Sequence, residues 1–81
     1  MQTFEFEFTL GGITRITTQL ENALYEGKCD DCLIWSRGGV VHLSFHREAE
    51  SMAKAIESAK ADVENAIPAL SVVAVEEGPF A

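Results

Sequence analysis

Apolar and polar residues alternate strictly near the start of the chain, from Thr3 to Leu10. In the segment TFEFEFTL, one set of alternating positions carries the apolar side chains Phe4, Phe6, Phe8 and Leu10. The other set carries Glu5 and Glu7 between two threonines. A period of two is typical of a strand with one buried side. Gly11-Gly12 then interrupts the pattern, so we predict that a strand ends there.

The apolar period changes to that of a helix after this strand. Positions that recur at helical spacing are Ile13, Ile16, Thr17, Leu20, Ala23 and Leu24. Gly27 stands where a glycine often ends a helix. These positions predict a helix from about Thr14 to Glu26.

A hairpin, a second helix and a last strand follow. The segments CLIWS and VVHLSFH, of which the second alternates again, are separated by RGG, which indicates a hairpin. The second helix is marked by an apolar stripe that consists of Met52, Ala53, Ile56, Ala59, Val63 and Ile67. Pro68 prevents that helix from continuing. The segment ALSVVAV predicts a fourth strand, followed by the short tail EEGPFA.

The resulting order is β-α-β-β-α-β, which is typical of an α+β, ferredoxin-like fold. In that fold two helices cover one face of a four-stranded antiparallel sheet. The first and third strands lie together in the middle, and the other sheet face is open. We predict a single domain over residues 1–81, without internal repeats.

The charge balance narrows the class of partner. Thirteen acidic against six basic residues give a formal net charge of −7. Direct binding of DNA or RNA depends on positive charge, so we expect no nucleic-acid ligand. A basic protein surface is the partner that this charge favours. No apolar run approaches the ~18 residues that span a bilayer, and no secretion signal is recognisable. We therefore expect a soluble, cytoplasmic protein without a membrane partner.

The cysteines and histidines have a spacing close to that of a zinc finger, C-x2-C-x9-H-x3-H, over Cys29, Cys32, His42 and His46. However, the alternation around the histidines predicts a strand, on which four residues span about 13 Å. Two zinc-bound nitrogens must lie within about 4 Å of each other. We therefore expect no metal and no other cofactor.

The sequence contains no recognisable arrangement of catalytic residues. Reactive thiols of a C-x-x-C pair are stabilised by positive charge or by a helix N-terminus. Here the cysteines follow a helix C-terminus and enclose Asp30 and Asp31. The chain has no glycine-rich phosphate loop and no serine or cysteine with a placed base. We expect a protein that is not an enzyme, and a metal-dependent or redox enzyme is the last alternative.

The open sheet face is the first candidate for a binding surface. Alternation directs Glu5, Glu7, His42, Ser44 and His46 to it. The orientation of Trp35 depends on the hairpin: a loop of two or four residues directs Trp35 outward, and a loop of three buries it. Two-residue loops are common, so we expect Trp35 on the open face beside Leu33 and Val40, as an interface anchor. A merely solvated face and a core tryptophan remain the alternatives.

The acidic residues are the second candidate. Apart from the strand glutamates, they comprise the loop residues Asp30 and Asp31 and, around the second helix, Glu48, Glu50, Glu57, Asp62 and Glu64. Spaced carboxylates on a small rigid body can imitate a phosphate backbone and occupy a basic channel. The alternative is an ordinary solvated helix face.

The segment from Ala23 to Ala66 resembles a bacterial domain that precedes a helix-turn-helix in uncharacterised regulator-like proteins. The resemblance is carried by ALYEGKCDD, by the F-x-REAES turn after Phe45, and by AIESAKADVENA. It implies the βαββαβ order, and it implies that Cys29-Asp30-Asp31 and Arg47-Glu48-Ala49 are framework positions. Members of that family continue into DNA-binding helices, whereas this chain ends at VEEGPFA, so DNA binding is not carried over. In size and charge the chain is also similar to small anti-CRISPR proteins, with which mobile elements block host defences.

Together these observations predict a binding protein that inhibits a basic, nucleic-acid-handling partner, in the most specific form an anti-CRISPR acting on a CRISPR–Cas effector complex. The alternative is a regulatory, dimerisation or antitoxin-like module of a helix-turn-helix family. Such a module would use the open sheet face, for example to form a homodimer.

Overall fold

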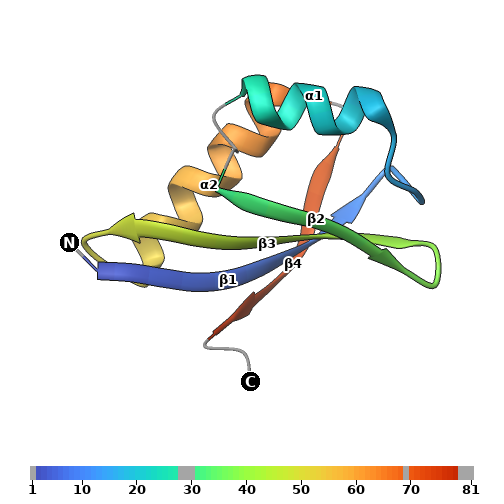
Figure 1. The fold of residues 1–81 in the computed structure, drawn as a ribbon. Coiled ribbons are helices and arrows are strands. Elements are labelled where there is room, and N and C mark those ends of the chain that lie inside the picture. The colour runs from blue at the N-terminus through green and yellow to red at the C-terminus, as the bar shows by residue number, and fades with distance from the viewer. Residues whose placement is uncertain (1, 28–30, 69, 79–81) are drawn as a thin grey trace.

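The chain folds into one antiparallel sheet with two helices on one of its faces (Figure 1). The computed structural model describes residues 2–27, 31–68 and 70–78. Its elements are, in chain order, β1 (Gln2–Gly11), α1 (Thr18–Glu26), β2 (Cys32–Arg37), β3 (Val40–Ala49), α2 (Met52–Ala66) and β4 (Ser71–Glu77). This order and the antiparallel four-stranded sheet confirm the predicted α+β, ferredoxin-like fold.

The strands lie in the order β2-β3-β1-β4, so β1 and β3 form the middle of the sheet as predicted. Phe6 lies opposite Phe45, and Phe8 lies opposite Leu43. A β-bulge interrupts the pairing of β4 with β1 between Thr9 and Leu10. The outer strands of the sheet are therefore β2 and β4. The pairing of β4 with its neighbour is interrupted by the bulge, whereas the pairing of β2 is continuous.

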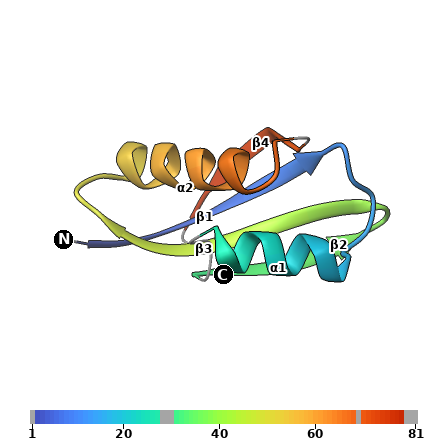
Figure 2. The same ribbon diagram turned by 90° about the horizontal axis from the view of Figure 1, so that it is seen from above.

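The core is the layer between the sheet and the helices (Figure 2). Its fully buried larger side chains are Phe6, Phe8, Leu24, Val41, Leu43, Phe45 and Val63. The rings of Phe6 and Phe45 stack with centroids 5.1 Å apart, and Phe8 packs at a tilt against both. The alternating positions of β1 and β3 therefore supply the sheet side of the core, as their pattern predicted.

Helix α1 is shorter than its apolar spacing indicated. It begins at Thr18, not near Thr14, and Thr17 is its N-cap, whose hydroxyl accepts a hydrogen bond from the N–H of Leu20 (3.1 Å). Ile13 and Ile16 do pack against the core, but from the non-helical segment that leads into the helix. Apolar spacing alone could not separate these two cases, whereas a threonine cap ends the helix at a definite residue.

The β2–β3 hairpin has a two-residue loop of two glycines, the loop length that the sequence analysis expected. Gly38 and Gly39 have φ values of 58° and 78°, the conformation of a type I′ turn, which glycine adopts at no steric cost. The turn places Trp35 opposite His42 and Ile34 opposite Leu43. Trp35 therefore faces away from the helices, which confirms its predicted orientation.

Candidate functional site

The sheet face that no helix covers displays its side chains in rows across the strands. One row consists of Glu76, Glu7, Ser44 and Leu33, and the next of Ala74, Thr9, His42 and Trp35. Glu5 and His46 form a third row. The face thus changes from acidic on the β1–β4 side to apolar at the β2–β3 hairpin.

His42 is the centre of a cluster on this face. Its ring stacks on Trp35, with centroids 4.2 Å apart and an interplanar angle of 18°. Its Nδ1 atom lies 3.3 Å from Thr9 Oγ1 and 3.5 Å from Glu7 Oε1. The side chains of His42 and Glu7 are mostly covered, whereas His46, 3.0 Å from Glu5, is mainly exposed. The imidazole of His42 is therefore held in place from both neighbouring strands.

Trp35 forms one side of an apolar corner at the hairpin. Its indole N–H donates a hydrogen bond to Ser44 Oγ (2.9 Å), and the residue is half-buried. Beside it, Leu33 is 68% exposed and Val40 is 37% exposed. Large apolar side chains exposed next to an aromatic residue are typical of interaction sites.

Two carboxylates lie directly opposite each other on the acidic side. Glu7 of β1 is the register partner of Glu76 of β4. Like charges directly opposite on neighbouring strands destabilise a sheet. Glu76 was not among the predicted site residues, because its partner became known only with the register of β4 against β1, which a bulge shifts.

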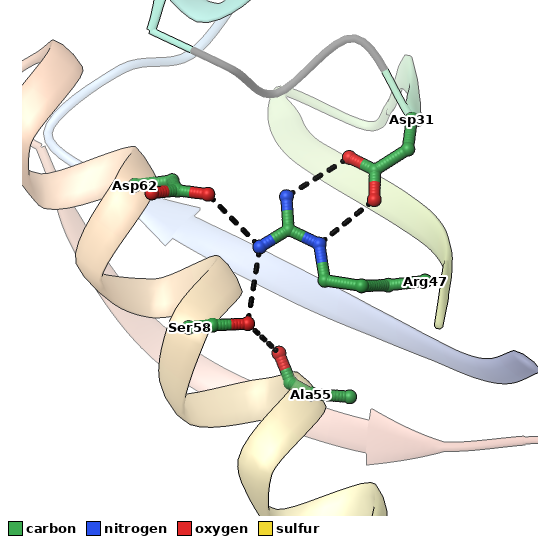
Figure 3. A network of polar contacts seen from close by, with 5 residues as sticks. All are labelled: Asp31, Arg47, Ala55, Ser58 and Asp62. Atoms are coloured by element: carbon green, nitrogen blue, oxygen red, sulfur yellow. Dashed lines mark hydrogen bonds and ion pairs between the residues drawn. The ribbon is translucent and has the colours of Figure 1, made fainter. Parts of the chain in front are cut away.

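Arg47 organises a second polar cluster, on the helix-covered side of the sheet (Figure 3). Its guanidinium donates two hydrogen bonds to Asp31 (2.7 and 3.0 Å), one to Asp62 (2.9 Å) and one to Ser58 (3.2 Å). It also lies 5.3 Å from the centre of the Phe45 ring. The hydrogen bond to Asp31, with the nearby charges of both aspartates, outweighs burial and raises the pKa of Arg47 above its ordinary value.

The Arg47 cluster assigns a structural role to two residues that were predicted to bind a partner. Asp31 and Asp62 were predicted to face a partner, but in the structure both hold Arg47, whose side chain is only 12% exposed. Two carboxylates and one cation tie β3, α2 and the segment before β2 together. Sequence reasoning missed this role, although Arg47 continues the inward-facing series Val41, Leu43 and Phe45, and an inward arginine requires carboxylate partners.

The predicted partner-binding residues consequently do not form one surface. Glu5, Glu7, Trp35 and His42 gather on the open face. Glu48 lies opposite Thr3 at one end of that face. Glu57 and Glu64 are exposed on α2, on the other side of the molecule, and Glu50 binds Lys54 (2.8 Å). Asp30 lies outside the described residues.

The histidine segment is extended, as the argument against a zinc finger required. His42 and His46 lie on β3, and each is directed to a different glutamate of β1. Within residues 2–27, 31–68 and 70–78, no group of three or more metal-binding side chains is close enough to hold an ion. Cys29, and with it the C-x-x-C pair as a whole, lies outside these ranges.

Neither described helix has the length and apolar character that crossing a bilayer requires. Comparison of the chain with protein-family models, with curated proteins and with solved structures finds no match.

Proposed function

We propose that this chain is a non-enzymatic binding protein whose open sheet face occupies a basic, nucleic-acid-binding surface of a partner protein. The observation that supports the proposal most directly is the opposition of Glu7 and Glu76 on an uncovered face. Among the described residues, neither carboxylate forms an ion pair with an arginine or lysine, and the imidazole of His42 lies 3.5 Å from Glu7. An arginine or lysine from a partner would convert that repulsion into attraction.

The apolar corner supplies the second half of such an interface. Leu33, Trp35 and Val40 lie beside the acidic rows on the same face. Charged groups steer and orient a partner, whereas a desolvated aromatic anchor contributes most of the affinity. A partner with a basic groove beside an apolar rim would match both parts.

In its most specific form the proposal names a CRISPR–Cas effector complex as the partner and an anti-CRISPR protein of a phage or prophage as the function. The small size and the net charge of −7 are what support this form. The test measures whether the protein displaces labelled target nucleic acid from purified effector complexes of several types. If every complex retains its nucleic acid at saturating protein, this specific form is wrong.

Two double variants that remove the same number of charges test whether the partner binds the open face. Glu7→Gln with Glu76→Gln removes two charges from the open face, and Glu57→Gln with Glu64→Gln removes two from α2. We expect the first to weaken binding at least tenfold, about 1.4 kcal/mol, and the second to have little effect. Equal losses in both variants would contradict an interface on the open face.

A regulatory or dimerisation module of a helix-turn-helix family is the second candidate. The exposure of Leu33 next to Trp35 favours it, because an apolar corner needs no charged partner. The two functions differ in salt dependence. Binding that is indifferent to salt but lost in Trp35→Ala would support the module and contradict the basic partner.

A further inference from the structure

Strand β2 is the outermost strand at one side of the sheet. It is paired with β3 on one side, and the strand order ends with it. The N–H of His46 on β3 donates to the carbonyl of Asp31 (3.3 Å), and such bonded positions alternate along an antiparallel pair. It follows that Ile34 and Ser36 direct their backbone N–H and carbonyl groups away from β3. These are the groups that another strand would bind.

The two edges of the sheet differ in how they are protected. Natural edge strands avoid further pairing through bulges, charges and prolines. Strand β4 has a bulge and ends in Glu76-Glu77. Strand β2 has an unbroken register, no proline, and a single charge, Arg37, at its end.

Charge also distinguishes β2 from the rest of the molecule. Of the six described helices and strands, β2 alone contains no aspartate or glutamate. Two copies that each carry a net charge of −7 repel each other along most approaches. The edge of β2 is the element at which two copies meet without bringing strand or helix carboxylates into opposition.

We propose that a second copy of this chain pairs with it antiparallel through β2, with the two-fold axis at Ile34. This register places Leu33 of each copy directly opposite Trp35 of the other, with Cβ atoms about 4.5–5.5 Å apart. The result is a continuous eight-stranded sheet, with the open faces of both copies on the same side.

The exposed side chains of β2 are complementary to one another, and this is the reason to propose a second copy as the strand that pairs with it. Leu33, 68% exposed in one chain, gains an aromatic neighbour from the other, and the symmetry repeats this contact. The edge is therefore complementary to itself. The inference does not depend on the proposed function, because it requires no other partner.

Sedimentation of the pure protein over a wide range of concentrations tests the dimer. We expect a species of twice the mass of one chain, and we expect Leu33→Glu to raise the dissociation constant by roughly a hundredfold. Val73→Glu is the matched control, since Val73 is 62% exposed but belongs to β4, at the opposite edge. A wild-type protein that stays monomeric throughout would overturn the proposal, and so would dissociation by Val73→Glu in place of Leu33→Glu.

A second pair of variants tests the backbone contact. Ser36→Pro removes an N–H that points to the free edge and leaves the β2–β3 bonds in place, so the monomer should fold. Ser36→Thr keeps that N–H. We expect the proline variant to be monomeric and the threonine variant to remain dimeric, with circular dichroism confirming that both are folded. A dimer that persists in both Ser36→Pro and Leu33→Glu would exclude the β2 edge.

Discussion

The guanidinium of Arg47 is held by three side chains that come from two distant parts of the sequence. Asp31 precedes β2, while Ser58 and Asp62 lie one turn apart on α2. Two partly covered carboxylates would lose their cation in Arg47→Met, which we expect to lower the free energy of unfolding by about 2–4 kcal/mol. Arg47→Lys should lose less, because an ammonium keeps the charge but not the two-pronged geometry. Urea denaturation measures both.

The matched control for Arg47 is Lys54→Met. Lys54 binds Glu50 at the exposed surface, and such pairs contribute less than about 1 kcal/mol.

The pH dependence of the stabilisation by Arg47 is a further check. The aspartates raise the pKa of Arg47, so its contribution is fully present below its unfolded pKa and is lost only as pH rises through the folded one. An arginine stays protonated far above neutral pH in both states, so the difference in the free energy of unfolding between wild type and Arg47→Met should not change between about pH 6 and pH 10.

The opposition of Glu7 and Glu76 makes a prediction about stability that is separate from any partner. Glu76→Gln should raise the free energy of unfolding by about 0.2–1 kcal/mol, because it removes a like charge opposite Glu7. The gain should shrink at high salt, which screens exposed charges. Glu77→Gln is the control, since Glu77 lies opposite Phe6. An equal gain from both variants would show a general effect of net charge and no specific repulsion.

At the scale of elements, Gly27 ends α1 where the sequence predicted, but the reason that a glycine stands there differs from the expected one. It does end α1, but its φ of −85° is accessible to any residue. Its Cβ, if it had one, would lie 2.6 Å from the Cβ of Ala66 on α2, closer than real contacts allow. Glycine is therefore required by the close approach of two helices, and not by a left-handed turn.

Gly27→Ala should accordingly destabilise the fold by about 1–3 kcal/mol, as overpacking does. In an Ala66→Gly background the same substitution should cost at least about 0.5 kcal/mol less, because the clashing methyl is gone. A double-mutant cycle by thermal or urea unfolding measures this coupling. Additive effects would mean that the helix contact is not the cause.

The elements themselves follow largely from the pattern along the chain. Alternation in β1 and β3 identifies which side chains are buried, and the glycine pair of the hairpin identifies the face of Trp35. Two features needed the tertiary structure. The start of α1 depends on the Thr17 cap, since Ile13 and Ile16 mimic another helical turn. The partners of Arg47 depend on how α2 packs against the sheet.

At the scale of the whole molecule, the arrangement of charge matters more than its amount. The acids that sequence reasoning grouped as one surface divide between the open face, the exposed side of α2 and the Arg47 cluster. A single flat partner can therefore contact only part of them. The open face is the part that combines carboxylates with exposed apolar side chains, which is why it, and not α2, carries the proposed interface.

The two proposed associations then respond to salt in opposite directions. Contact between the acidic face and a basic partner is attraction between unlike charges, so it should weaken as salt screens them. Pairing of two copies through β2 brings together bodies of net charge −7, so screening should strengthen it. Measuring both dissociation constants over one salt series, with Ser36→Pro as a monomeric reference for the partner titration, separates the two. If self-association weakened with salt as partner binding did, carboxylates would have to lie in the dimer contact, and the acid-free edge of β2 could not be that contact.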